Sequence, residues 1–443
     1  MSLKVLVACP ADEKFFVHLM ASCLFAKRHH PELEADILVP AANVPNWWSF
    51  SAPWLRIFNN TTDAKSSYDL VIQLHPDPAV AESLRVIKTE HRSGVVSQDS
   101  IMVNGRWAQV FLAQLGARRF APFSAHDLFN NMLLGRTAPH MPSPTANHYG
   151  EWVVHIESMP PDQRPWGEEL LSQMNFAHPN RARLEITYPL NTDKISAYVG
   201  CNAALASWLA YHQVPVVLLH EGEFDPRLVL AGPQCWYYKF SSQLTSGQVI
   251  ALLRPNATAS NGLHYTNEFL GGLAPVPSEE KIESVTRVFD NLNYIVLNYL
   301  NDLREVDLPI PAISSSCCLQ LKGTQSVLAK LVHLNQFGMR FLQEFLAKVE
   351  TGNVNDKDVQ DITQKVTEID ELTDKTLLTY PELDLYRMTL RFAKASAQGE
   401  NILEIAKSLI LVLHESNQTL QVYSELIETI IKRHVRPQDS ANA

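Results

Sequence analysis

The first 255 residues alternate short apolar runs with amphipathic stretches, a pattern typical of strands that alternate with helices. Leu3–Ala8 is a short apolar run, Phe15–His29 is predicted to be a helix, and Ala35–Val39 is a second apolar run. Tyr68–His75 (YDLVIQLH) is the clearest strand of this part, since Leu, Val and Ile follow one another in it. Strand, helix and strand in this order predict an α/β fold with a doubly wound parallel sheet.

The pattern restarts after a proline-rich stretch, Arg136–Tyr149, which we interpret as a linker. Trp152–Ile156 is then predicted to be a strand and Gly167–Met174 a helix. The sequence therefore predicts two Rossmann-type halves, an N-terminal half of residues 1–140 and a trimmed C-terminal half of residues 141–256.

A turn, a helix and a strand follow one another closely in the second half. Asn202 is a good N-cap for the predicted helix Ala203–Tyr211, which is apolar nearly all round, as a buried helix should be. The β-branched run Val216–Leu219 suits a buried parallel strand, and the loop after it carries Glu221 and Glu223. Free N–H groups and the helix dipole make the N-terminus of such a helix the expected place for a phosphate.

After a loop rich in Pro, Asn, Gly and Ser at residues 255–277, the pattern becomes helical. Apolar residues recur at helical spacing in Glu279–Asp302, Thr324–Glu350, Asp356–Leu378, Pro381–Ala397 and Asn401–Arg433. Amphipathic helices with short loops predict an antiparallel, all-α helical bundle over residues 278–434. The bundle is either an ordinary folded domain without a site or a module for self-association or for binding a protein partner.

Composition narrows the classes of function. The chain has 443 residues and a net charge of -10, which argues against a nucleic-acid binder and against an anionic membrane surface as the main partner. No apolar run is long enough to span a bilayer and the N-terminal one is too short for a signal peptide, so a cytoplasmic protein is expected. The 6 cysteines show no zinc spacing, and neither a metal nor a cofactor is predicted. Cys317 and Cys318 are expected in a Ser-rich loop.

The segment YVGCNAALASWLAYHQVPVVLLHEGEFDP, residues 198–226, resembles a motif of the ADP-heptose:lipopolysaccharide heptosyltransferases, glycosyltransferase family 9. The family pattern is roughly N-D-T-G-x-x-H-L-A-A-A-L-G-V-P-V-V-A-L-F-G-x-T-D-P. When the Val-Pro pairs are aligned, Asn202 stands at the family's Asp, Ala203 and Ala204 at Thr-Gly, and Ser207 at His. The resemblance covers residues 1 to about 255 and implies a GT-B-like pair of Rossmann-type halves, followed here by the helical bundle. It also implies that Asn202, Ala203, Ala204 and the acidic loop would face the nucleotide.

The start of the chain resembles the family's opening, a strand, a Gly-Asp turn, a helix and then a His-Pro pair. Counting back from the His-Pro pair places the family's Gly-Asp on Lys14 and Phe15. The Asp that the resemblance implies to be the general base is therefore absent from its own position. Asp12 and Glu13 lie close by, and each is either a shifted catalytic base or a solvated loop charge.

Three further positions belong to the cleft that the resemblance implies. His75 ends a predicted strand, where open α/β sheets bind ligands, although a lone histidine is more often structural. Gln163 stands where the family has a Lys that would neutralise phosphate charge, and Arg164 matches the family's Arg. The Trp-rich loop Asn43–Trp54 is either a surface for a sugar acceptor or a local hydrophobic cluster.

Two functions of different classes fit these observations. The first is a degenerate or inactive glycosyltransferase-like protein that serves as a binding or scaffold module through its helical bundle. The second, which the resemblance implies, is an active metal-independent glycosyltransferase with a nucleotide-sugar donor and a glycan acceptor, in surface-polysaccharide or protein glycosylation. The loss of the Gly-Asp turn, the Lys and the Thr-Gly-x-x-His set favours the first, because catalytic groups act as a unit. A dehydrogenase is disfavoured because no G-x-G-x-x-G follows a predicted strand.

Overall fold

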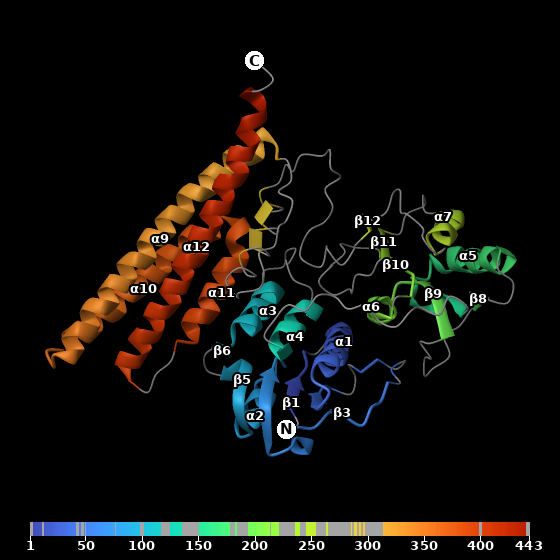
Figure 1. Cartoon of the computed structure of the whole chain (residues 1–443), viewed down its shortest axis with the longest axis horizontal. Helices are drawn as coiled ribbons and strands as arrows, with labels where there is room; N and C mark the ends of the chain where they lie inside the picture. Colours follow the sequence, from blue (N-terminus) through green and yellow to red (C-terminus); the bar gives the residue numbers. More distant parts are fainter. Residues whose placement is uncertain are drawn as a thin grey trace. The chain divides into compact units, whose positions relative to one another are not determined.

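The structure is a computed structural model, and the chain divides into two units (Figure 1). The first unit comprises Met1–Val96 and Phe120–Ala274, and the second comprises Ser97–Arg119 and Pro275–Ala443. The structure describes residues 3–10, 13–40, 44–45, 48, 50–75, 77–97, 102–116, 125–134, 150–177, 182–183, 194–212, 214–220, 235–239, 245–253, 263–264, 285, 288–289, 292–293, 296, 313–397 and 401–439.

Parallel strands form the first sheet of the first unit, in the order β3-β2-β1-β4-β5. They are β1 (Leu3–Ala8), β2 (Leu33–Leu38), β3 (Leu55–Phe58), β4 (Ser67–Gln73) and β5 (Lys88–Ser97). In the central strand β1, Val5 and Ala8 are both 0% exposed, as expected for a parallel strand covered on both faces. The short strand β3 is one that the sequence pattern does not predict.

Helices cover this sheet. Helix α1 (Glu13–His29) packs against α4 (Ala125–Leu134). Helix α2 (Pro78–Arg85) places Leu84 against Leu6 of β1 and Val71 of β4. The Asp77 carboxylate caps α2 by accepting a hydrogen bond from the backbone N–H of Ala79 at 2.8 Å.

The second sheet has the order β12-β11-β10-β9-β7-β8, and its described pairings are parallel except that of β12 with β11. Its strands are β7 (Glu151–His155), β8 (Ala182–Arg183), β9 (Ile195–Gly200), β10 (Val216–His220), β11 (Cys235–Lys239) and β12 (Leu263–His264). The accompanying helices are the 3-10 helix η3 (Ile156–Ser158), α5 (Arg164–Ala177), α6 (Ala203–Tyr211) and α7 (Ser246–Leu252). Strand β9 was not predicted, because Ser196 and Tyr198 interrupt its apolar run.

The apolar side chains of this sheet form one core with α5 and α7. Val154, Val199 and Val217 from neighbouring strands pack with Leu170 of α5 and Val249 of α7. The predicted α/β class, a GT-B-like pair of Rossmann-type halves followed by helices, is thus confirmed by the two mainly parallel sheets and the helices after them.

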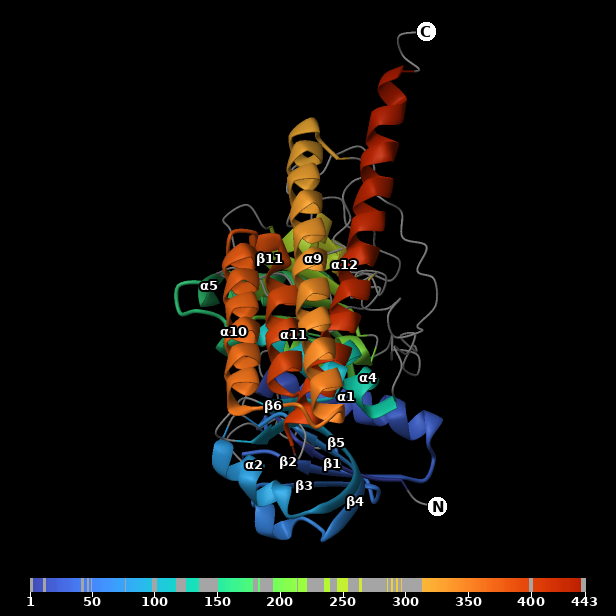
Figure 2. The ribbon, with the colours of Figure 1, turned by 90° about the vertical axis from the view of Figure 1, so that its left-hand side faces the viewer.

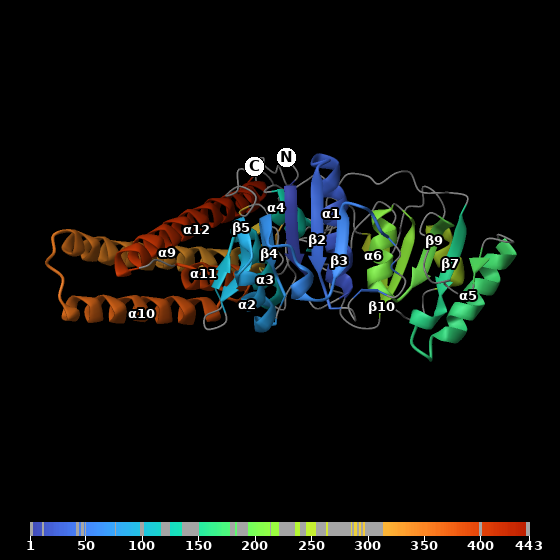
Figure 3. The same ribbon diagram turned by 90° about the horizontal axis from the view of Figure 1, so that it is seen from below.

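The second unit is built from long helices. They are α9 (Ser315–Glu350), α10 (Asp356–Leu378), α11 (Asp384–Ala395) and α12 (Ile402–Asp439). Helix α9 packs against both α10 and α12, and these helices run side by side in Figures 2 and 3. At their crossing, Gly338 of α9 lies between Ile369 of α10 and Leu413 of α12, where a Cβ would come within 3.2 Å of the Leu413 side chain.

The predicted Ser-rich loop around Cys317 and Cys318 is wrong. Both cysteines lie in the first turn of α9, where they are 0% and 6% exposed. The helix starts earlier than predicted because Ser314 caps it, its Oγ accepting from the Cys317 N–H at 3.2 Å. The predicted helix Glu279–Asp302 lies mostly outside the described residues, but its described members, such as Phe289, are buried in the core of this unit.

Residues 97–119, which the sequence analysis assigns to the N-terminal half, group with the helices in the second unit. They contain β6 (Met102–Asn104) and α3 (Arg106–Gly116), and α3 packs against α11. The Ser396 hydroxyl at the end of α11 accepts from the Val103 N–H at 3.0 Å and lies 2.7 Å from the Val103 carbonyl oxygen. This contact joins segments 293 residues apart, which a local pattern does not reveal.

Candidate functional site

Each sheet of the first unit has a point where the strand order reverses, and open parallel sheets bind ligands at the carboxyl ends of the strands there. In the first sheet this point lies between β1, which ends at Ala8, and β4, which ends at Gln73. In the second sheet it lies between β7, which ends at His155, and β9, which ends at Gly200. His75 therefore follows one reversal point, and Asn202 follows the other.

At the reversal point of the second sheet, hydrogen bonds through Ser158 join the segment after β7 to the turn after β9. The Ser158 hydroxyl, which follows β7, donates to the His155 carbonyl at 2.7 Å and accepts from the Cys201 N–H at 2.9 Å. Gly200 is required here because a Cβ would lie 2.6 Å from the Tyr198 hydroxyl and 2.9 Å from the His155 Cβ. The Ser158 side chain thus joins the turn before α6 to the turn after β7.

Helix α6 begins as the sequence predicts, with Asn202 as its N-cap. The Asn202 Oδ1 accepts from the Leu205 N–H at 2.9 Å. Ala204 is 1% exposed, whereas Asn202 and Ala203 are half-buried. Ser207, at the family's His position, is fully buried and donates to the Ala203 carbonyl at 2.7 Å. The side chain at that position therefore faces its own helix.

His155 of β7 and Arg164 of α5 are two described titratable residues on the elements beside this turn. Burial lowers the pKa of His155 from 6.5 to about 4, so its imidazole is neutral at pH 7, and its Nδ1 lies 3.1 Å from the Tyr198 hydroxyl. Arg164 is the first residue of α5, is exposed, and its Nε donates to the Met159 carbonyl at 3.3 Å. Gln163 precedes it, and its N–H donates to the Pro160 carbonyl at 2.9 Å.

His75, beyond the end of β4, has a structural environment. It is 8% exposed, and its Nδ1 accepts from the Asp77 N–H at 3.1 Å. The Gln73 side chain donates to the His75 carbonyl at 3.2 Å. Burial lowers the pKa of the imidazole, partly offset by the Asp77 carboxylate. His75 is therefore neutral at pH 7 and holds the turn between β4 and α2.

Aromatic side chains join the two halves within the first unit, where α1 packs against α6. The Trp48 ring lies 5.0 Å from Phe16 of α1 and 4.7 Å from Trp208 of α6, edge-on to both. Trp208 in turn stacks on Tyr211 at 5.8 Å and is 3% exposed. Of the two interpretations of the Trp-rich loop, these contacts support a hydrophobic cluster for Trp48.

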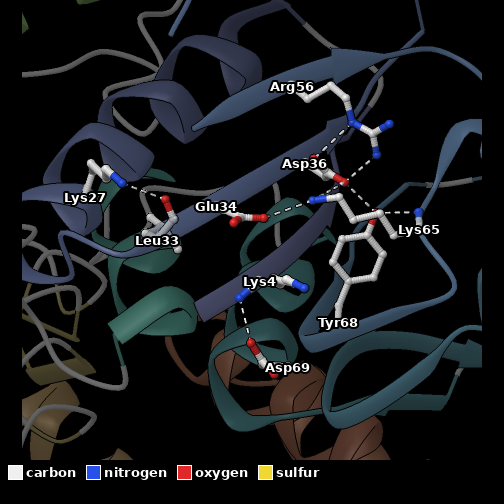
Figure 4. Close-up of polar contacts among 9 residues, drawn as sticks. All are labelled: Lys4, Lys27, Leu33, Glu34, Asp36, Arg56, Lys65, Tyr68 and Asp69. Carbon is white, nitrogen blue, oxygen red and sulfur yellow. Dashed lines mark hydrogen bonds and ion pairs between the residues drawn. The ribbon is translucent and has the colours of Figure 1, made fainter. Parts of the chain in front are cut away.

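A charged cluster lies at the edge of the first sheet (Figure 4), and a cavity of about 560 Å³ lies beside it. The Asp36 carboxylate, 3% exposed, accepts from Arg56 at 3.1 and 2.5 Å and from the Tyr68 hydroxyl at 2.6 Å. Lys65 lies 3.2 Å from Glu34 and 3.8 Å from Asp36. The two carboxylates and the two cations balance in charge within the cluster.

The structure does not describe the side chains of the remaining predicted site residues. Asp12, Glu221 and Glu223 lie outside the described residues, and Glu13 begins α1 without a described side chain. The sequence pattern does not single out Ser158, because its partner Cys201 is 43 residues away in the chain. The glycine at position 200 is a sequence feature that could have indicated this contact. A glycine in a turn leaves room for a residue from a neighbouring strand end, here Ser158, to come close.

Comparisons with known proteins give a partial structural match. No family model matches the chain, and no curated protein matches its sequence. Among the solved structures that match are the E. coli heptosyltransferase WaaC with ADP-2-deoxy-2-fluoro heptose (TM-score 0.39) and the same enzyme with ADP (TM-score 0.36). Each is 14% identical to this chain, and each comparison covers 56% of this chain and 98% of the enzyme. The chain is thus structurally similar to a heptosyltransferase over part of its length, at low identity.

None of the helices among the described residues is both long and apolar enough to cross a membrane. The same residues contain no group of His, Cys, Asp and Glu side chains placed to hold a metal ion.

Proposed function

We propose that this chain is a glycosyltransferase-like protein of heptosyltransferase type that does not transfer sugar and acts as a binding or scaffold module through its helical bundle. The observation that carries the proposal is the turn before α6, where a nucleotide diphosphate would have to bind. The N–H groups of Cys201 and Leu205 already donate to side-chain oxygens of Ser158 and Asn202.

A diphosphate at this turn would have to displace both oxygens. Each intramolecular hydrogen bond is worth about 1 kcal/mol, so the turn is less ready for an anion than an uncapped helix end. Ala203 and Ala204 add no hydroxyl, and Ser207 is committed to its own helix. Arg164, at the start of α5, is exposed and donates to the Met159 carbonyl. Phosphate charge would therefore be poorly neutralised.

The described histidines at the strand ends, His75 and His155, do not support a role as general base or as a ligand-binding residue of the cleft. His75 and His155 are neutral and buried at their strand ends. Asp12 and Glu13 remain the candidates for a base, and Glu221 and Glu223 the candidates for the nucleotide side, as the sequence resemblance implies. Two carboxylates near a diphosphate would repel it by about 1 kcal/mol each at short range.

The scaffold role is supported by apolar side chains on the outside of the second unit. Leu319 and Phe337 of α9 are 72% and 50% exposed, and Leu372 and Leu378 of α10 are 52% and 59% exposed. Exposed apolar side chains mark a binding surface where they form a contiguous patch, and we propose that these residues contribute to one. We propose that residues 278–434 mediate self-association or binding of a protein partner.

A turnover assay tests the absence of catalysis. The full chain is incubated with ADP-, GDP- and UDP-sugars, and release of nucleotide and transfer to a glycan acceptor are measured. We expect neither above the background of a heat-treated sample. Steady nucleotide release that follows protein concentration would instead establish an active glycosyltransferase.

Light scattering and partner capture test the scaffold role. We expect either a mass above that of the monomer or capture of a protein partner. Leu372→Ser should weaken whichever of these associations is observed. Phe176→Ser is the matched control, because Phe176 is 92% exposed on α5 of the first unit. A monomer without partners, or equal effects of the two substitutions, would contradict the scaffold role.

A further inference from the structure

Helices α9 and α10 form a hairpin, and a short turn joins them in Figure 3. A Cβ on Gly338 of α9 would meet Ile369 of α10. Phe341, one turn later in α9, has its ring 4.1 Å from the ammonium of Lys365, one turn earlier in α10. The two helices are therefore antiparallel, and these contacts fix which of their residues lie at the same level.

Apolar side chains are exposed along one side of this hairpin. The Phe337 ring of α9 is 50% exposed and meets the Phe341 ring edge-on at 4.4 Å. Leu372 of α10 is 52% exposed and follows Lys365 by two turns, so it lies on the same side of its helix. Phe337, Phe341 and Leu372 thus form an apolar strip along the seam between the helices, which marks a contact surface more than scattered exposed residues would.

The charges beside this strip differ in sign between the two helices. On α9, Lys330 and Arg340 are exposed, and on α10, Glu368 and Glu371 are exposed. The ion pairs that the described residues of these helices form involve other side chains. Glu368 accepts a hydrogen bond from the neutral Gln364 side chain at 2.8 Å. All four charges therefore lack an oppositely charged partner within the described chain.

A two-fold axis parallel to the helices places this face against the same face of a second copy. It sets α9 of each copy over α10 of the other, as antiparallel neighbours. Such an axis keeps every residue at its own level, and Arg340 and Glu368 are both within one turn of the contact between Gly338 and Ile369. Arg340 of one copy therefore faces Glu368 of the other, and the symmetry makes this pair twice.

The rest of the face is compatible with the same arrangement. Glu344 of one copy lies at the level of Lys365 of the other, and both are exposed. Lys330 and Lys375 are like charges near the end of α10, where long side chains extend into solvent. Helix α10 has 23 residues and is about 35 Å long. Two such helices side by side offer about 700 Å² per copy, close to the roughly 800 Å² that a stable interface buries on each partner.

We propose that two copies of this chain associate through the outer face of α9 and α10, with α9 of each copy packed on α10 of the other. Burial of the apolar strip drives the association, and the opposite charges set its orientation. The proposal rests on the proposed scaffold function and names the partner, a second copy of the chain.

Light scattering of the full chain and of two charge reversals tests the pairing. We expect the mass of a dimer for the unsubstituted chain. Arg340→Glu and Glu368→Arg should each weaken association at least about tenfold, because each sets like charges against one another twice in the dimer. An equimolar mixture of the two variants should recover the dimer, because in a mixed pair each reversed charge meets its opposite. Glu425→Arg, at an exposed position of α12, is the matched control and should keep the mass of the dimer.

Recovery on mixing distinguishes a contact between copies from a structural effect inside one chain, and unchanged helical circular dichroism shows that the variants fold. A dimer that withstands both reversals, or variants that stay monomeric when mixed, would overturn the proposal and leave the scaffold function standing. The same holds for a monomer that captures a different protein. Sugar transfer by a dimer that behaves as expected would instead overturn the proposed function alone.

Discussion

Replacing Asp36 by asparagine tests how strongly the charged cluster at the edge of the first sheet holds that sheet together. Asp36 is 3% exposed and joins three strands, since it accepts from Arg56 of β3 and from Tyr68 of β4 while it belongs to β2 (Figure 4). Asparagine keeps the size of the side chain but removes its charge and one acceptor oxygen.

The expected loss of unfolding free energy in Asp36→Asn depends on how exposed the hydrogen-bond partners of Asp36 are. Breaking a buried ion pair costs about 3–5 kcal/mol, and a hydrogen bond to a charged group is worth about 1.5–3 kcal/mol. The Arg56 side chain is 45% exposed, so solvent screens its share, whereas the Tyr68 hydroxyl bond is buried. We therefore expect Asp36→Asn to lower the free energy of unfolding by about 2–3 kcal/mol.

Urea unfolding at pH 7, followed by tryptophan fluorescence, measures this loss, because every tryptophan except Trp107 lies in the first unit. Glu34→Gln is the matched control, since Glu34 shares the strand and pairs with Lys65 at 3.2 Å, with both side chains more than 40% exposed. The control should lose under about 1 kcal/mol. Equal losses for the two variants, or a loss below about 0.5 kcal/mol for Asp36→Asn, would refute the reasoning.

The acid dependence of the same variant has a defined sign. Hydrogen bonds from Arg56 and Tyr68, with the charges of Lys65 and Arg56, outweigh burial and hold the pKa of Asp36 below its usual value. A lowered folded-state pKa gives stability that is present above the unfolded pKa of about 3.9 and is lost as the pH falls towards the folded value. Asp36→Asn should therefore be less sensitive to acid below about pH 4 than the unsubstituted chain.

Three further predictions concern the second sheet and the contact between α1 and α6. Gly200→Ala should lower the free energy of unfolding in urea by about 1–3 kcal/mol, because its Cβ would lie 2.6 Å from the Tyr198 hydroxyl. Trp48→Ala should cost about 2 kcal/mol, since it removes ring contacts at 4.7 Å to Trp208 and 5.0 Å to Phe16; a loss below about 0.5 kcal/mol would show that the rings do not hold α1 to α6. Burial holds the folded pKa of His155 at about 4, below its unfolded value, so about 3 kcal/mol of stability present above pH 6.5 should be lost as the pH falls to 4. Urea unfolding at pH 7 and pH 4 should show this loss in the unsubstituted chain and a smaller one in His155→Gln.

Local features of the chain could be predicted from sequence. Helix α6 spans Ala203–Tyr211 with Asn202 as its cap, because its start and its apolar composition are both encoded within a dozen residues. Strand β1 and helix α10 likewise have the predicted bounds. Such elements depend on neighbouring residues, which a sequence pattern contains.

The missed features depend on residues far apart in the chain. Ser158 meets Cys201 across 43 residues, and Val103 meets Ser396 across 293. Strand β9 is buried along its length but carries Ser196 and Tyr198. The Ser196 hydroxyl donates to the Gly150 carbonyl, and the Tyr198 hydroxyl lies within hydrogen-bond distance of the His155 Nδ1. Only the folded arrangement supplies such partners, so neither the strand nor the closed turn beside it follows from the pattern.

The central claim is that the turn before α6 does not hold a nucleotide sugar, because Ser158 and Asn202 already accept hydrogen bonds from two of its N–H groups, those of Cys201 and Leu205. Calorimetric titration of ADP-, GDP- and UDP-sugars into the full chain and into Asn202→Trp tests it most directly. The account predicts no saturable binding below millimolar concentration in either protein. Micromolar affinity for an ADP-sugar that Asn202→Trp abolishes would contradict it.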